Sequence, residues 1–382
     1  MLQNIIVLLI FIVIFCVLVV SHEGGHFLIA KANGIRVTEF TVGLGPVLYQ
    51  KKKGDTMYSI RLLPIGGACI FDGMDGLEVT KPGEDDDCDE EAKKDMESLD
   101  ESQDDDQYGQ ISFRRANVWS RIATVIAGPM ANFLLGFILA MIIVSNTYWS
   151  FPTVSGFSVD NSPAQEAGLM EGDLITSVNG NPVHMSAEVT LNMYLTDGED
   201  VEITYERDGQ SYTTTITPIL YEDEDTGVSR YVIGIYIGEY DTVSGIETFK
   251  YAGYMFNYYL TSTWKSLGLL VRGRTDKVEL SGPVGMAEMV DESYESAMET
   301  GGIIDVILNM VNLAMLLSIN LGLMNLLPIP ALDGGRLVFL LIEVIRGKPV
   351  PEKYEGMIEL VGVALLIALM VVVLFHDVSK LF

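Results

Sequence analysis

Four long apolar runs divide the chain, and each is long enough to cross a lipid bilayer. A hydrocarbon core of about 30 Å needs roughly 20 mostly apolar residues in a helix. The runs cover 2–30, 118–145, 303–327 and 357–375. The first has no basic residue before Lys31 and no small-residue cleavage site, unlike a cleaved signal peptide. The pattern predicts a multi-pass α-helical membrane protein with about four transmembrane helices.

Two other segments show strand-like patterns. Residues 35–50 and 57–69 alternate apolar and polar positions around a turn at 51–55, which predicts a β-hairpin. The stretch 151–238 has an Asn179-Gly180 turn signal followed by alternation, which is typical of an inserted α+β domain. The aromatic-rich stretch 249–270 predicts an interfacial amphipathic helix.

These patterns together predict the domain organisation. The expected division is 1–34 for the first transmembrane helix, 35–117 for a loop with the hairpin and an acidic insertion (84–107), 118–148 for the second helix, 151–238 for the inserted domain, 245–300 for an amphipathic linker, 303–345 for the third transmembrane segment and 355–378 for the fourth helix.

Basic residues set the expected orientation. Lys and Arg cluster in or beside the segments between the first and second runs and between the third and fourth. The positive-inside rule puts both segments in the cytoplasm and both termini outside. The long 150–300 segment is then extracytoplasmic, since long segments translocate largely regardless of their charge.

The net charge of −28 does not indicate a nucleic-acid-binding protein. A mean hydropathy of +0.30 agrees with a membrane protein. Much of the charge lies in the acidic tract 84–106, and such runs are usually solvated and self-repelling. We expect the tract to take no part in the chemistry. A divalent ion or a basic cytoplasmic partner bound there is the alternative. Cys16, Cys69 and Cys88 imply no disulfide framework.

The strongest chemical signal is His22-Glu23-Gly24-Gly25-His26, directly after the first apolar run. Residues i and i+4 share a helix face, so both imidazoles can bind one cation while Glu23 reaches the attacking water. A chance match beside a membrane anchor is the alternative. Ionisable groups at membrane depth are costly and functional by default, which favours a catalytic metal site.

Such a site needs a third protein ligand. Positions 29 and 32, on the same strip of the helix, are Ile and Ala, and His184 and His376 fall on the opposite side of the predicted membrane. Asp333 follows the third apolar run at the same predicted depth as His22, after two prolines that break the helix. Asp333 is therefore the candidate, and a plain helix-end turn is the alternative.

Several short motifs occur in one order along nearly the whole chain. They are the His22-to-His26 motif, Gly43-Leu44-Gly45-Pro46, Ala127-Gly128-Pro129 with Asn132-Phe133, Ser281-Gly282-Pro283-Val284-Gly285 and the 325–335 segment. Together they closely resemble the site-2 protease family of intramembrane zinc metalloproteases, RseP type. The resemblance implies Zn²⁺ held by His22, His26 and Asp333, with Glu23 as catalytic base. Arg336 stands where many relatives have His, and the acidic tract is also unusual.

The inserted domain resembles a PDZ domain. Ser162-Pro163-Ala164, Ala167-Gly168-Leu169 and Gly172-Asp173-Leu174-Ile175 stand at PDZ spacing, and 154–157 looks like the loop that binds a peptide carboxylate, with Gly156 and Phe157 as substrate-binding candidates. Peptide binding in the groove and a size filter remain alternatives. In the resembled family this region forms a β-loop that dips toward the active site. An edge strand there would be able to pair with an unwound substrate; an ordinary hairpin is the alternative.

The sequence thus predicts an intramembrane zinc endopeptidase of the cell membrane, with its active site near the cytoplasmic side. Its expected partners are the lipid bilayer and single-span membrane proteins, such as anti-sigma factors or signal-peptide remnants. Asn325 is expected to bind the unwound substrate backbone. One rival is a membrane-anchored PDZ scaffold with a structural zinc site, which would not need the base Glu23. Another is a zinc transporter, which would carry more than the four histidines present.

Overall fold

The computed structural model describes residues 2–73, 110–158, 162–222, 229–274, 282–300 and 302–380. The acidic insertion 84–107 and Cys88 lie outside the described residues, so expectations for them stay predictions. The chain forms two compact units. Unit 1 comprises Met1–Gly136 with Thr275–Phe382, and unit 2 comprises Phe137–Arg274.

Unit 1 is built mainly from long helices. They are α1 (Leu2–Ala32), the first part of α3 (Val118–Asn146), α7 (Pro283–Thr300), α8 (Ile303–Asn325), α9 (Asp333–Arg346) and α10 (Glu352–Lys380), with a short 3₁₀ turn η1 (Phe113–Arg115). Within the described ranges, four helices are long and apolar enough to cross a membrane: Ile6–Ala32, Val118–Asn146, Ile303–Asn325 and Lys353–Phe375. The expected four-helix membrane architecture is confirmed.

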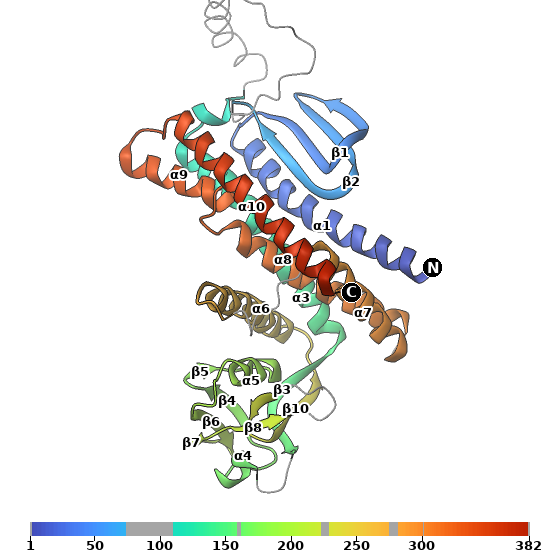
Figure 1. The fold of residues 1–382 in the computed structure, drawn as a ribbon, viewed down its shortest axis with the longest axis vertical. Helices are drawn as coiled ribbons and strands as arrows, with labels where there is room; N and C mark the ends of the chain where they lie inside the picture. The colour runs from blue at the N-terminus through green and yellow to red at the C-terminus, as the bar shows by residue number, and fades with distance from the viewer. Residues whose placement is uncertain are drawn as a thin grey trace, which may run out of the picture. The chain divides into compact units, whose positions relative to one another are not determined.

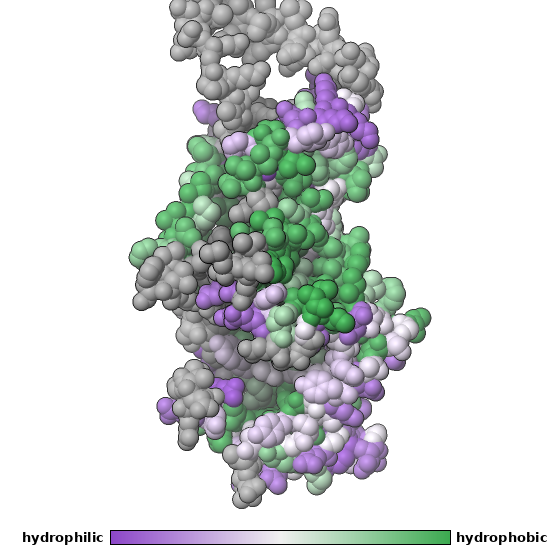
Figure 2. Space-filling view, turned by 90° about the vertical axis from the view of Figure 1, so that its right-hand side faces the viewer, coloured by the Kyte–Doolittle hydropathy of each residue, from purple (hydrophilic) through white to green (hydrophobic). Residues whose placement is uncertain are grey.

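One hydrophobic core joins the first and third of these spans. Phe11, Ile14 and Leu18 recur on one face of α1, and they pack with Val290 of α7 and Leu313 of α8. Figure 1 shows α1, α7 and α8 alongside one another. The outer faces of the helices remain apolar, as Figure 2 shows over unit 1. A helix that is apolar on all sides suits a bilayer rather than water.

The predicted hairpin is present as β1 (Val37–Lys53) and β2 (Thr56–Phe71). Its strands curl, so that residues 37–42 pair with 67–71 on one side and with 57–60 on the other. Residues 67–71 are thereby the edge of a small sheet, next to α1. A Cβ atom at Gly67 would lie 2.6 Å from Cγ1 of Val19, so only glycine permits this approach.

The third apolar segment, expected over 303–345, is interrupted where its prolines predict. Helix α8 ends at Asn325 and α9 begins at Asp333. Pro328 and Pro330 have no N–H to donate, and the chain between the helices turns back tightly. A Cβ atom at Gly334 would lie 2.1 Å from the Leu327 carbonyl oxygen, so the start of α9 packs directly on this turn.

Unit 2 contains the predicted PDZ domain. Its six-stranded sheet has the order β10-β3-β4-β6-β7, with β5 paired to β4, and β8 pairs with β9 separately. The strands are β3 (Tyr148–Phe157), β4 (Leu174–Val178), β5 (Asn181–Pro182), β6 (Val201–Arg207), β7 (Gln210–Ile216), β8 (Ile219–Glu222), β9 (Ser229–Val232) and β10 (Ile235–Thr242). Helices α4 (Pro163–Glu166) and α5 (Ser186–Tyr194) complete the domain around a core that includes Val154, Ile175 and Ile203.

The prediction of a loop at 154–157 is wrong. These residues form the end of β3, where Gly156 pairs with Tyr236 and Phe157 with Ile235 of β10. The next N–H, of Ser158, donates to the Gly234 carbonyl oxygen. Because this backbone is paired in a strand ladder with β10, it is not an open loop. A peptide-binding role for Gly156 and Phe157 stays a prediction.

The stretch 245–300, expected as one linker, forms two helices that belong to different units. Helix α6 (Glu247–Val271) is part of unit 2, where Tyr251 contacts Trp149 and Lys265 donates to Asn192 of the PDZ domain. Helix α7 packs into the core of unit 1. Tyr251 and Tyr254 of α6 therefore pack on the PDZ domain, and an interfacial position for α6 stays a prediction.

Candidate metal centre

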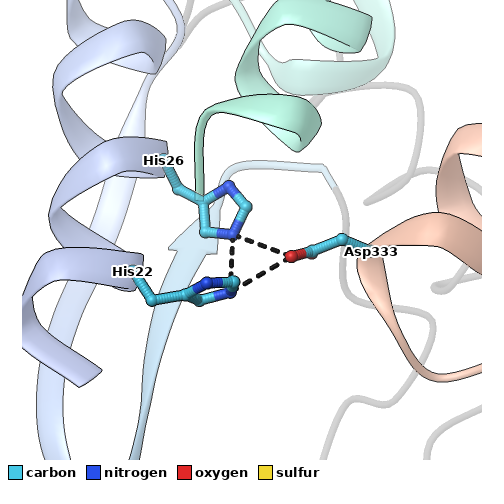
Figure 3. A group of neighbouring side chains, drawn as sticks. All are labelled: His22, His26 and Asp333. Carbon is cyan, nitrogen blue, oxygen red and sulfur yellow. Dashed lines mark hydrogen bonds and ion pairs between the residues drawn. The ribbon is translucent and has the colours of Figure 1, made fainter. Parts of the chain in front are cut away.

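Three side chains from two helices converge in unit 1. His22 and His26 are one turn apart on α1, and Asp333 is the first residue of α9 (Figure 3). The two Nε2 atoms lie 3.2 Å apart, and Oδ2 of Asp333 lies 3.1 Å from that of His22 and 3.3 Å from that of His26. The i, i+4 spacing and the proline turn after α8 bring together the three residues that the sequence singled out.

This triangle fits a tetrahedral metal ion. Zinc bound by nitrogen and oxygen at about 2.0–2.1 Å in tetrahedral geometry holds its ligand atoms about 3.3 Å apart. Oδ2 of Asp333 is buried without a hydrogen bond of adequate geometry, although two imidazoles flank it. Three converging lone-pair donors repel one another unless a cation lies between them. Among the residues that the structure describes, His22, His26 and Asp333 are the one group of three or more His, Cys, Asp or Glu side chains close enough together to hold a metal ion.

A backbone carbonyl sets the tautomer of His26. Its Nδ1 lies 2.8 Å from the carbonyl oxygen of Thr124, which can only accept a hydrogen bond. Nδ1 therefore carries the proton, and Nε2 presents its lone pair to the other two ligand atoms. A hydrogen bond of this kind, donated by the ring nitrogen that does not bind the metal, commonly orients a metal-binding histidine.

Glycines allow α1 and α3 to approach closely at this point. A Cβ atom at Gly25 would lie 2.3 Å from the Ala127 carbonyl oxygen, and one at Gly128 would lie 2.2 Å from Nε2 of His26. A larger residue at either position would displace a helix or a ligand. The Ala127-Gly128-Pro129 motif thus keeps space beside the ligands.

Helix α9, which presents Asp333, is held on two sides. Arg121 of α3 forms two hydrogen bonds with Glu343, one of them 3.1 Å long, and Leu340 packs in the core with Ile122 and Val125. On the other side, Arg336 bonds Glu359 of α10 at 3.3 Å. These contacts fix the helix that carries the third ligand.

Glu23 and Asn325 line the same cavity as the three ligands. The cavity has a volume of about 320 Å³, and its wall includes the sheet edge 67–71 and Arg336. One metal-binding group is thus surrounded by a carboxylate, an amide and the backbone of a strand edge. The arrangement suits attack of water on a peptide bond.

The remaining residues that the sequence analysis considered for the site do not join the metal centre in the part of the chain that the structure describes. His184 is in unit 2, where its ring stacks on Tyr254 at 3.8 Å, and the side chain of His376 is not described. Gly156 and Phe157 are also in unit 2. No sequence signal points to Thr124, because any residue can supply a carbonyl. Asn132 follows the Ala127-Gly128-Pro129 motif, but no spacing pattern links its side chain to His22.

Residues 10–369 match the family model of peptidase family M50. The chain belongs to this family, the site-2 proteases, and is a zinc metalloprotease of a multi-pass membrane type. The expectation from the sequence is confirmed at this level, including zinc as the cofactor.

Relatives are similar over nearly their full length. The zinc metalloprotease RasP of Shouchella clausii is 36% identical over 98% of this chain and 99% of its own. The regulator of sigma-W protease RasP of Bacillus subtilis is 33% identical over 97% of this chain and 98% of its own. The crystal structure of the PDZ domain of an SdrC-like protein from Listeria monocytogenes aligns with 23% of this chain and 86% of its own, at 26% identity and a TM-score of 0.20.

Proposed function

We propose that this zinc metalloprotease cleaves the transmembrane segments of single-span membrane proteins. The observation that carries the proposal is the location of His22, Glu23 and His26 within the candidate membrane span Ile6–Ala32. Catalytic groups at that depth are useful only for a peptide bond that is also in or near the membrane, because burying them there is costly.

Each residue has a proposed role. Nε2 of His22, Nε2 of His26 and Oδ2 of Asp333 hold the zinc ion, which, when bound, polarises the scissile carbonyl and makes water more acidic. Glu23 accepts a proton from the attacking water and passes it to the leaving amine. Support for this role comes from the shared cavity in which Glu23 faces the ligands.

A substrate helix must unwind before its carbonyl can be attacked, because its amides are hydrogen-bonded within the helix. The edge 67–71 of the hairpin lies in the cavity wall, where an unwound segment can add to it as a further strand, and Asn325 offers an amide. Pairing with this edge would stabilise the extended substrate and hold its carbonyl in the cavity.

The substrate class and the membrane side are also part of the proposal. A relative is described as a regulator of sigma-W protease, which supports membrane-bound anti-sigma factors as substrates in regulated intramembrane proteolysis. Signal-peptide remnants share the same chemistry of a single apolar span. The Lys and Arg residues beside the first and third spans favour a centre near the cytoplasmic side of a bacterial cell membrane.

Purified full-length protein in lipid nanodiscs, incubated with single-span substrates, tests the proposal. We expect cleavage within the span, loss of cleavage with a zinc chelator, and recovery on zinc addition. Glu23→Gln should lower turnover by at least about 100-fold, the scale of a lost general base, while zinc content stays near that of the unaltered protein.

The matched control is a soluble peptide with the ectodomain sequence of the same substrate, which should remain uncut. Cleavage confined to the soluble peptide would contradict an intramembrane activity. Unchanged turnover by Glu23→Gln would contradict the proposed base.

A further inference from the structure

Asn132 is a buried polar residue without an assigned role, next to the metal centre. It lies on α3 with no exposed surface, and its side-chain Nδ2 is 3.4 Å from Nδ1 of His22. Its Oδ1 is buried with no hydrogen-bond partner among the residues that the structure describes. An amide in an apolar interior is costly unless it bonds, so its position beside a ligand calls for an explanation.

The tautomer of His22 identifies which amide atom belongs there. Nε2 of His22 faces Asp333 and His26, so Nδ1 is the ring nitrogen on the Asn132 side. A neutral imidazole that binds a cation through Nε2 carries its proton on Nδ1, which then must donate. An amide nitrogen is also a donor, and two donors cannot bond each other.

Rotation of the amide by half a turn about Cβ–Cγ exchanges its two ends and brings Oδ1 to Nδ1–H. The oxygen that points away from His22 has no partner, so the rotation breaks no hydrogen bond of Oδ1, and the contact with His22 decides between the two orientations. With the oxygen facing His22, Asn132 does for this ligand what the Thr124 carbonyl does for His26.

The main chain at Asn132 is well placed to hold the side chain still. Ser318 of α8, itself buried, donates to the Asn132 carbonyl oxygen at 2.8 Å, and Ser21 of α1 donates to that of Ala131 at 3.2 Å. The residue therefore sits where α1, α3 and α8 meet. Asn132 is not among the described residues that line the cavity with Glu23. It is therefore not placed to contact a substrate there.

We propose that Asn132 is a positioning residue of the metal centre. Its Oδ1 accepts the Nδ1 proton of His22, fixes the tautomer that presents Nε2, and orients the ring toward Asp333 and His26. This inference rests on the proposed role of His22 as a zinc ligand. Partners of this kind typically change metal affinity by about 10–100-fold when removed.

Zinc affinity of the purified full-length protein, measured by competition with a chromophoric chelator, tests the inference without any substrate. Asn132→Leu, of similar volume but without an acceptor, should lower affinity about 10–100-fold. Asn132→Asp keeps the acceptor and should stay within about threefold of the unaltered protein. Ser318→Ala is the matched control: it removes a bond to the same residue but not the amide, so affinity should change little.

The order of the two variants separates positioning from packing. If Asn132 only fills space, leucine should serve better than a buried carboxylate, and Asn132→Asp should show the larger loss. That order, or unchanged affinity in Asn132→Leu, overturns the inference. If Asn132→Leu does not fold, Asn132→Ala replaces it with the same expected loss. The visible spectrum of Co²⁺-loaded protein gives a second readout, with weaker tetrahedral bands expected for Asn132→Leu.

A His22→Ala variant keeps this test distinct from the proposed function. Full zinc affinity in His22→Ala would remove His22 from the metal site and the proposal with it. Lost affinity in His22→Ala together with full affinity in Asn132→Leu would overturn the role of Asn132 alone.

Discussion

At the residue scale, the centre depends on three lone-pair donors that a neutral interior would not tolerate together. Oδ2 of Asp333 is the charged member of the set, and it lies within 3.3 Å of both imidazole nitrogens. Removing its charge leaves two neutral ligands and a weaker amide oxygen. The third ligand should therefore matter more for metal retention than for folding.

Asp333→Asn should lower zinc occupancy and abolish turnover, because an amide oxygen is a neutral and poorer ligand than a carboxylate. Metal analysis of the purified variant measures the first effect, and cleavage of a single-span substrate the second. Asp55→Asn is a suitable control, because Asp55 pairs with Lys31 and is not part of the donor set. Full occupancy with normal turnover in Asp333→Asn would mean that another residue is the third ligand.

The two glycines inside the histidine motif are expected to differ in their tolerance of a side chain. A Cβ atom at Gly24 meets nothing within 4 Å, whereas one at Gly25 lies 2.3 Å from the Ala127 carbonyl oxygen. Gly24→Ala should be neutral or stabilise the helix by up to about 1 kcal/mol. Gly25→Ala should destabilise by about 1–3 kcal/mol through overpacking and reduce zinc content.

Thermal unfolding and metal analysis of the two variants compare adjacent positions of one helix. Equal stability of the two would show that the α1–α3 distance can relax at Gly25. In the sequence alone, Gly24 and Gly25 are equivalent. The difference arises from a helix about 100 residues away, which no local pattern encodes.

At the element scale, the turn between α8 and α9 is enclosed by α10, whose surface is otherwise largely exposed. A Cβ atom at Gly362 of α10 would lie 2.4 Å from Cβ of Pro330 and 2.6 Å from its carbonyl oxygen. Pro330 is three residues before Asp333. The C-terminal helix therefore supports the position of the third ligand in addition to crossing the membrane.

Gly362→Ala should push α10 away from the turn, cost about 1–3 kcal/mol, and lower zinc affinity by moving Asp333. Gly356→Ala on the same helix is the matched control, because a Cβ atom there meets nothing within 4 Å. Chelator competition on both variants measures the effect. If the two variants bind zinc equally well, α10 is not needed to position Asp333.

The elements that the sequence predicted well are those set by local physics. Four apolar runs, the break at Pro328 and Pro330, and the 51–55 turn follow from bilayer thickness, missing N–H groups and alternation. The prediction of a loop at 154–157 failed because these residues pair with β10, which lies about 80 residues further along the chain. The prediction of a single linker over 245–300 failed because α6 and α7 are each placed by tertiary contacts within a different unit.

At the scale of the whole molecule, the chemistry is confined to one unit. All three candidate ligands, Glu23 and the enclosing cavity belong to unit 1. Unit 2 has its own core and its own helix α6, which contacts the PDZ domain through Tyr251 and Lys265. Because it contributes no group to the described centre, we expect the PDZ domain to govern which substrates reach unit 1.

Deleting the PDZ domain should therefore change substrate choice and leave the chemistry in place. The deletion should span 148–242 rather than the expected 151–238, so that β3 and β10 are removed whole. With a flexible linker in their place, zinc content should persist, and a substrate with a short ectodomain should still be cleaved. A substrate with the same span and a bulky folded ectodomain, which we expect the full chain to reject, should now be cut. The deletion combined with Glu23→Gln is the control for contaminating proteases. An unchanged size limit after deletion would assign the selection to unit 1 and contradict a gating role.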